Sequence, residues 1–332
     1  MRLLKSLFSL VFLAGIAFLG WAAWFATTPL QLAASPLDFV VEPGMPLRAA
    51  SQQMAKAGLG FASWEFTLLG RMLGRAADIK AGSYEVEQGI TPLQLLDKLT
   101  RGDVTQSEVV FVEGKTFRQL RAALDANPDI RHDTAGLSDA DVLMRIGAVE
   151  THPEGLFFPD TYLFAKQSSD LRVLRRAYLA MQAKLDAEWR TRDPSLPYAS
   201  PYEALIMASI VEKETGQPGD RPKVASVFVN RLKKGMLLQT DPTVIYGMGE
   251  RFDGNIRKND LGADTPYNTY TRGGLPPTPI ALPGLASIRA ALHPPATDFY
   301  YFVARGDGSS EFSRNLDEHN RAVARYQKRR GG

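Results

Sequence analysis

The chain has 332 residues, of which 45% are hydrophobic and 23% charged, a composition that is typical of a globular protein and excludes a disordered or fibrous one. A net charge of +3 is too small to indicate binding to nucleic acid. The absence of cysteine excludes a disulfide framework, a cysteine-ligated metal centre and a thiol nucleophile.

The N-terminal segment Leu7–Ala26 is long and apolar enough to span a membrane. It carries no charge, and 20 helical residues extend about 30 Å, the thickness of a bilayer core. Arg2 and Lys5 precede it, and no further Lys or Arg occurs until Arg48. By the positive-inside rule we expect residues 1–6 to stay cytoplasmic, with a single pass through the cytoplasmic (inner) membrane and the rest of the chain outside it.

A cleaved signal peptide is the alternative interpretation of this segment. Its apolar core has about 7–15 residues and ends at small side chains, whereas this run is longer and has Trp24 and Phe25 near its exit. We therefore expect an uncleaved anchor. Residues 27–37 then read as a short linker.

A repeated pattern follows the anchor. An extended apolar stretch, a Gly turn and an amphipathic helix occur three times, with extended stretches at 39–44, 84–89 and 109–114 and helices at 47–57, 91–99 and 116–124. A further helix is expected over 64–73. Because units this small need neighbours to bury their apolar faces, we expect one compact α+β module over 38–108 and a larger α+β domain over 109–332.

The larger domain shows both helical patterns and a long loop-rich stretch. Residues 235–295 are rich in Gly, Pro, Asn and Asp, which is typical of loops that carry a functional site. We expect helices over 116–126, 138–146, 170–189, 202–215 and 221–234, and a terminal hairpin of 299–304 with 311–313.

Carboxylates at the end of one buried helix are the candidate catalytic groups. Residues Ala204–Val211 are nearly all apolar, which indicates a buried helix, and the chain continues as Glu212-Lys213-Glu214. Burial and the negative end of the helix dipole would both raise a carboxyl pKa, as a general acid requires. Positions two apart point about 200° apart, so only one of the two can face a given cleft. The alternative is that both are solvated charges.

Motifs in fixed order resemble the YceG-like family, the MltG-type endolytic murein transglycosylases. The run Ala208–Thr215 (ASIVEKET) is similar to the central motif of that family. The other matching stretches are 154–162 (EGLFFPDTY), 224–232 (VASVFVNRL), 238–247 (LQTDPTVIYG), 267–270 (YNTY), 274–277 (GLPP) and 279–280 (PI). Together with the anchor, the resemblance covers nearly the whole chain.

The resemblance implies that Glu214, the second Glu of the Glu-Lys-Glu-Thr run, is the catalytic residue. Other lytic transglycosylases place their acid in a Glu-Ser pair at a helix end, and Glu214-Thr215 is a similar pair. The implied reaction cleaves the β-1,4 bond between N-acetylmuramic acid and N-acetylglucosamine inside a nascent strand and leaves a 1,6-anhydro end, which would terminate or size glycan elongation. No metal or cofactor is needed for it. The four histidines are scattered and lack the spacing of metal ligands.

The family motifs also supply candidates for contact with the glycan. They are Glu154, Glu212, Asn230, Gln239, Asp241, Tyr246, Tyr267 and Asn268, whose polar groups can bind N-acetyl groups and whose rings can pack on sugar faces. The first two repeated units resemble the LysM-like part of the family, which is either a glycan-binding module or a spacer. The implied partners are peptidoglycan strands, the membrane and penicillin-binding cell-wall synthases.

Two other functions stay open at this point. A hydrolytic muramidase would need a second carboxylate near Glu214, with Glu154 or Asp241 available. A non-catalytic scaffold would bind glycan for the synthases without cutting it.

Overall fold

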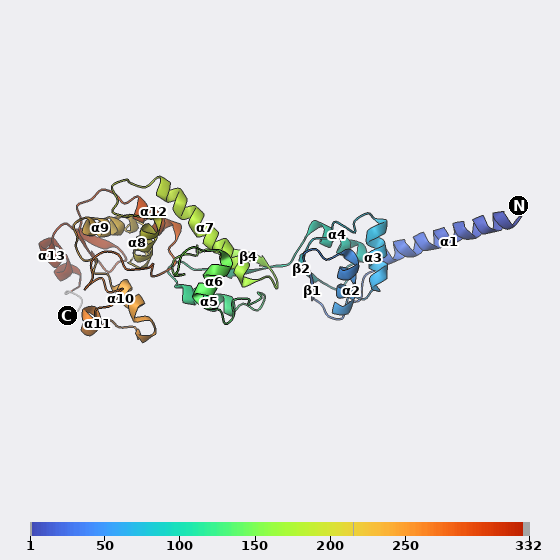
Figure 1. Ribbon diagram of the computed structural model, residues 1–332, viewed down its shortest axis with the longest axis horizontal. Coiled ribbons are helices and arrows are strands. Elements are labelled where there is room, and N and C mark those ends of the chain that lie inside the picture. The colour runs from blue at the N-terminus through green and yellow to red at the C-terminus, as the bar shows by residue number, and fades with distance from the viewer. Residues whose placement is uncertain (1, 215, 328–332) are drawn as a thin grey trace. The chain divides into compact units, whose positions relative to one another are not determined.

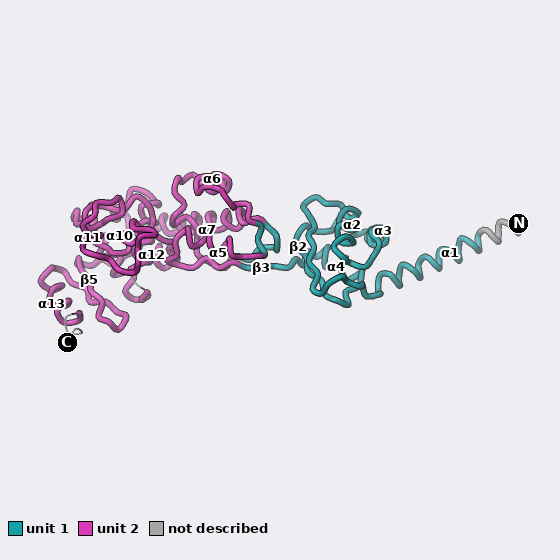
Figure 2. The backbone as a smooth tube through the Cα atoms, turned by 90° about the horizontal axis from the view of Figure 1, so that it is seen from below, with its two compact units in different colours: residues 1–108, 129–131, 163–168 teal, residues 109–128, 132–162, 169–332 magenta. Residues whose placement is uncertain are grey.

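The computed structural model describes residues 2–214 and 216–327. The chain divides into two compact units. Figure 1 colours the chain by residue number, and Figure 2 colours it by unit. Unit 1 comprises residues 1–108, 129–131 and 163–168, and unit 2 comprises 109–128, 132–162 and 169–332. Helices are combined with two-stranded sheets, and the chain begins with a long apolar helix. The expected mixed α+β class is therefore confirmed.

Unit 1 is built on an antiparallel pair of strands with helices between and beside them. Its elements in order are α1 (Arg2–Thr27), β1 (Leu37–Val41), α2 (Leu47–Ala57), α3 (Ser63–Met72), β2 (Gly82–Val86) and α4 (Pro92–Arg101). Leu37 lies opposite Val86, and Val41 lies opposite Gly82. The core contains apolar side chains from both strands and all four helices. The strand–turn–helix units expected from the sequence are present as β1–α2 and β2–α4.

The second of these helices begins where its sequence predicts. The hydroxyl of Thr91 accepts a hydrogen bond from the Gln94 backbone N–H, and the Gln94 side chain accepts one from the Thr91 N–H. Pro92 occupies the first turn, where no N–H is needed. This arrangement fixes the start of α4 and turns its apolar face, with Leu95, into the core.

Residues 27–37, which the sequence predicts to be a short linker, pack against unit 1. Leu30 is buried, and its N–H donates to the carbonyl of Ile90. Leu32 forms a β-bridge with Leu59. The last turns of α1 also belong to the core, because Phe25 is only 7% exposed. The segment therefore continues the fold of unit 1 without a loose tether.

Unit 2 is mainly helical. Its elements are α5 (Phe117–Asp125), α6 (Asp139–Ile146), α7 (Asp170–Arg190), α8 (Pro201–Glu214), α9 (Arg221–Lys233), α10 (Asp241–Met248), η1 (Gly249–Arg251), α11 (Lys258–Gly262), α12 (Leu285–Leu292), the hairpin of β5 (Tyr301–Ala304) and β6 (Ser310–Ser313), and α13 (Leu316–Tyr326). A third strand pair joins β3 (Gln106–Val110) to β4 (Thr161–Ala165), and its residues are divided between the two units.

Helix α8 is the centre of unit 2. It packs against α7, α9, α10 and α12, and every residue from Ala204 to Val211 is buried, as the apolar run predicts. The Ser200 hydroxyl accepts a hydrogen bond from the Glu203 N–H, which caps the start of the helix. The loop-rich stretch 235–295 differs from expectation in one respect, because three short α-helices (α10, α11 and α12) and the 3-10 helix η1 form within it.

Candidate active site

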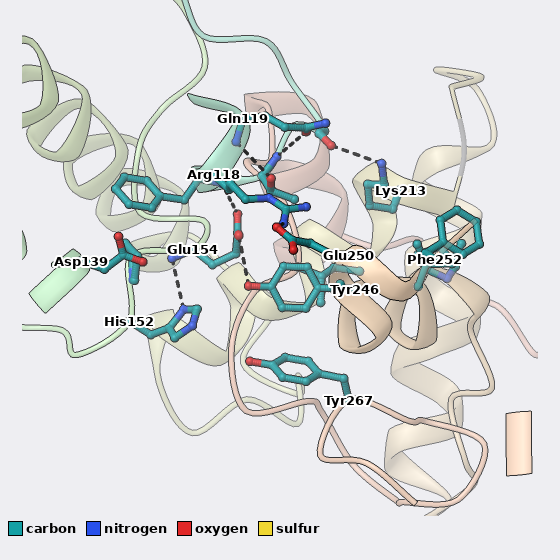
Figure 3. Close-up of a pocket in the computed structure, with 18 residues that line it drawn as sticks. Arg118, Gln119, Asp139, His152, Glu154, Lys213, Tyr246, Glu250, Phe252 and Tyr267 are labelled. Carbon is teal, nitrogen blue, oxygen red and sulfur yellow. Dashed lines mark hydrogen bonds and ion pairs between the residues drawn. The ribbon is translucent and has the colours of Figure 1, made fainter. Parts of the chain in front are cut away.

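A cleft of about 840 Å³ opens on unit 2 and gathers polar and aromatic side chains from distant parts of the sequence (Figure 3). Its walls come from the start of α5, the turn at 152–154, the end of α8 and the segment from α10 to residue 252. The lining includes three of the predicted site residues: Glu154, Tyr246 and Tyr267. The ring of Tyr267 meets the ring of Tyr246 edge to face, with 4.9 Å between their centroids.

Glu154 is a buried carboxyl at the floor of this cleft. It is only 3% exposed. One oxygen accepts a hydrogen bond of 2.9 Å from the backbone N–H of Phe117, and the other accepts one of 3.1 Å from the Tyr246 hydroxyl. Burial raises the pKa of Glu154 to about 7, although both hydrogen bonds oppose that rise. The group therefore changes charge near neutral pH.

Glu214 ends α8, as the sequence predicts, and its side chain is half-buried. Burial is the largest influence on its carboxyl and raises its pKa. The Thr240 hydroxyl donates a hydrogen bond to it and favours the anion, while Asp241 opposes the anion and the Arg231 guanidinium favours it. Glu214 itself is not among the described residues that line the cleft, but its neighbour Lys213 is.

Helix α10 connects the two carboxyls. Its first residue, Asp241, lies near Glu214 and accepts a 2.5 Å hydrogen bond from the Tyr270 hydroxyl. Tyr246, five residues later, reaches Glu154, and five helical residues extend about 7.5 Å. The carboxyls of Glu154 and Glu214 are thus both held against α10. This helix belongs to residues 235–295, the stretch that the sequence predicts to carry a functional site.

Glu212 points to a different place, as the angle between positions two apart requires. One of its oxygens accepts hydrogen bonds from the backbone N–H of Gly284 and from the Ser287 hydroxyl, at 3.0 and 2.7 Å. These groups form the N-terminus of α12, where a negative charge is favourable. Arg221 lies 3.7 Å from the other oxygen. These contacts give Glu212 a role in joining α8 to α12, and its contact with glycan stays a prediction.

Two predicted asparagines hold the backbone of neighbouring loops. The Asn230 amide donates to the carbonyls of Thr297 and Phe299, and the Asn268 amide donates to the carbonyls of residues 260, 261 and 263. Their amide N–H groups are therefore occupied within the protein. Gln239 is exposed and has a positive φ of 51°, so the backbone turns sharply just before Thr240. Direct contact of these three residues with substrate stays a prediction.

Two residues near Glu214 were not singled out by the sequence analysis. Thr240 and Arg231 are both buried. The Arg231 guanidinium donates to the carbonyls of Tyr300, Leu237 and Leu238, so it is fixed by neutral groups. Both residues lie inside motifs that resemble the family (224–232 and 238–247), and this was the sequence feature that could have identified them. Thr215, the partner of Glu214 in the predicted pair, lies outside the described residues.

Within residues 2–214 and 216–327, His, Asp and Glu side chains nowhere gather in a group of three or more that could hold a metal ion. Glu154 and Glu214 each have protein partners of their own. The arrangement offers two carboxyls that can give and take protons, beside a cleft with aromatic walls.

Several known proteins are similar to this chain. The model of the YceG-like family matches residues 39–325. The endolytic murein transglycosylase of Bacillus subtilis is 35% identical over 268 residues, which are 76% of this chain and 74% of that protein. The protein of the same name from Streptococcus pneumoniae is 26% identical over 283 residues, and the match covers 75% of this chain but only 51% of that longer relative.

A solved structure matches as well. A YceG-like protein of Listeria monocytogenes superposes with a TM-score of 0.55 at 29% identity, and the match covers 86% of this chain and 98% of that one. The chain belongs to the YceG-like family.

Proposed function

We propose that this protein is a membrane-anchored endolytic murein transglycosylase in which Glu214 is the catalytic acid and base. The relative from B. subtilis carries that name and matches three quarters of both chains, and this observation supports the activity most strongly. The raised pKa of the Glu214 carboxyl at the end of a buried helix supports its role, because a general acid must keep its proton near neutral pH.

The proposed reaction needs one carboxyl and no water. Glu214 protonates the oxygen of the β-1,4 bond between N-acetylmuramic acid and N-acetylglucosamine, and this bond breaks. The Glu214 carboxylate then accepts the proton of the muramic acid C6 hydroxyl as its oxygen attacks C1, which closes a 1,6-anhydro ring and restores the acid. The Arg231 cation and the Thr240 hydroxyl favour the transient carboxylate.

The cleft on unit 2 then receives the strand. Tyr246 and Tyr267 offer ring faces for sugars, and the polar groups beside them can bind N-acetyl groups. The hydrolytic muramidase and the non-catalytic scaffold are both less favoured, because the curated relatives are named transglycosylases.

Three matched variants test the assignment. Glu214→Gln keeps the size of the side chain and removes the transferable proton, so we expect cleavage of peptidoglycan to fall roughly 100- to 10,000-fold. Glu212→Gln changes the other carboxyl at the same helix end, and its activity should fall far less than that of Glu214→Gln. Glu154→Gln is the third variant. A fully active Glu214→Gln protein together with an inactive Glu154→Gln protein would move the catalytic role to the cleft floor.

Product analysis in 18O-labelled water separates the reactions. A transglycosylase leaves anhydromuramic ends without heavy oxygen, and mass spectrometry of the muropeptides detects them. Heavy oxygen at the new end would identify a hydrolase. The absence of any cleavage by a folded protein would favour the scaffold.

We also propose that α1 is a retained anchor with a cytoplasmic N-terminus. Phe8–Thr27 is apolar and long enough to cross a bilayer. Phe25 and Ala26 belong to the core of unit 1, so cleavage after the apolar run would remove core side chains. Mass measurement of the mature protein from membranes would reveal a loss of residues 1–26, and such a loss would contradict the anchor.

We propose that the module over residues 38–108 is LysM-like. We also propose that it lies beside nascent glycan strands and the penicillin-binding synthases that make them. Its strand–helix–helix–strand order supports this reading. A hollow of about 490 Å³ opens between the β1–α2 loop and the α3–β2 loop, where an N-acetylated glycan would have access to backbone groups. Titration of Glu214→Gln protein with N-acetylglucosamine oligomers, read at probes on these two loops, distinguishes a binding module from a spacer.

A further inference from the structure

Helix α3 of unit 1 has two apolar faces. One face is buried in the core and includes Phe66 and Leu69. The other includes Trp64, which is 58% exposed, and Met72, which is 43% exposed, eight residues or about two helical turns further on. Leu68 lies between them on the same face, and Leu73 follows the helix as another exposed apolar side chain. Single exposed apolar side chains are ordinary, but a stripe of them beside a membrane anchor needs an explanation.

The stripe continues the surface of α1. The indole of Trp64 stacks on that of Trp21, with 5.3 Å between the ring centroids and 12° between the planes. Trp24, on α1, is also exposed. Figure 1 shows α3 running across the direction of α1, at the end of the module that α1 enters. A helix in this position lies along a membrane surface when its neighbour crosses the membrane.

The length of α1 requires the module to approach the bilayer closely. Of the 20 residues in the apolar span Phe8–Thr27, the last seven, from Trp21, run beside the module, which leaves 13. Thirteen helical residues extend about 20 Å, whereas a bilayer core is about 30 Å thick. Ser6 and Leu7 add only about 3 Å before Lys5. Tilting of the helix would increase the shortfall.

The charges on α3 suit the membrane interface as well. Glu65 is its only acidic residue, and its carboxylate accepts a hydrogen bond from the Ala62 N–H at the start of the helix. Arg71 is exposed near the other end. Trp side chains and cationic residues are enriched where a membrane meets water.

We propose that the exposed face of α3 lies in the outer interface of the bilayer that α1 crosses, so that Trp64 and its neighbours contact lipid. The proposal rests on the proposed anchor. It makes α3 a second membrane contact, and the two helices together hold unit 1 at the bilayer surface in a fixed orientation.

Site-directed labelling of the full chain in phosphatidylcholine vesicles tests this contact. The sequence has no cysteine, so single-cysteine variants take one nitroxide each without further changes. Met72→Cys and Leu73→Cys report on the stripe, Val11→Cys reports on the span, and Asp103→Cys is an exposed control in the same module. Collisions of each nitroxide with oxygen, which enters lipid, and with a nickel chelate, which stays in water, are measured by electron paramagnetic resonance.

We expect the labels at 72 and 73 to gain oxygen collisions and lose nickel collisions relative to the label at 103. Burial against protein would lower the collisions with oxygen and with nickel alike, so more oxygen collisions together with fewer nickel collisions indicate lipid. Equal behaviour of the labels at 72, 73 and 103, while the label at 11 reports hydrocarbon, would overturn the proposal and leave the stripe for a protein partner. A label at 11 that reports water would contradict the anchor itself, and this inference with it.

Discussion

Replacing Glu154 by Gln tests whether the cleft floor holds a carboxyl that the fold keeps protonated. The raised pKa of Glu154, about 7 against an ordinary value of 4.5, means that the folded protein prefers the neutral form. The stabilisation is present in full below pH 4.5 and is lost as the pH rises to about 7, because over that range the unfolded chain releases its proton and the folded one keeps it. Gln is neutral throughout and similar in shape.

The size of the effect follows from the two pKa values. Their difference is about 2.5 units, and each unit corresponds to 1.36 kcal/mol, so the wild-type protein should lose about 3 kcal/mol between acidic and mildly alkaline pH. The variant should not lose this contribution. The amide oxygen of Gln can accept from the Phe117 N–H, and its NH2 group can donate to the Tyr246 oxygen, so the local structure is kept.

Thermal unfolding of both proteins at pH 4.5, 6, 7 and 8 measures the difference. Other carboxyls titrate equally in both proteins, so the change in the gap between the two Tm values isolates Glu154. For a unit of this size about 3 kcal/mol corresponds to roughly 6–12 °C. The same gap at all four pH values would refute the reasoning, because it would show that Glu154 has an ordinary pKa in the fold.

Three further substitutions probe the site and the module. Thr240→Val removes the hydroxyl that favours the Glu214 anion, so the pKa of Glu214 should rise and the alkaline limb of the kcat/KM profile should move to higher pH, with Thr240→Ser restoring it. Gly155→Ala places a Cβ at φ 78° and against a proline ring, and should cost about 1–3 kcal/mol in thermal unfolding. Phe25→Ala should cost about 3–5 kcal/mol in detergent-solubilised protein. The exposed Trp24→Ala is its control, and equal losses would contradict the packing of α1 on the module.

The sequence predicted most elements of this fold because its local signals agree with its packing. The apolar run Ala204–Val211 indicates a buried helix, and α8 is buried along that length. The start of α8 is also decided locally, because the Ser200 hydroxyl caps it through the Glu203 N–H. Residues 27–37 gave no such local signal. Their polar and small residues resemble a linker, and distant partners that bond to their backbone, among them Ile90 and Gly58, hold them in place.

The candidate site was predictable only in part, because its residues lie in sequence motifs but their surroundings do not. Glu154 and Glu214 lie 60 positions apart in two separate motifs, and the resemblance to a family marked both. Their environments arise from tertiary contacts that no local pattern contains. The opposite directions of Glu212 and Glu214 followed from helix geometry alone, but the partner of Glu212, the N-terminus of α12, did not.

The division of the chain between the two units has a consequence for cutting or recombining this protein. The chain passes from one unit to the other five times, because residues 129–131 and 163–168 belong to unit 1. Within unit 1, the Lys166 ammonium lies 3.0 Å from the Glu85 carboxylate, and the Gln167 N–H donates to the carbonyl of Asp129. A truncation between residues 108 and 109 would therefore take these pieces away from the module. An exchange of unit 1 between relatives therefore has to carry residues 1–108, 129–131 and 163–168 together.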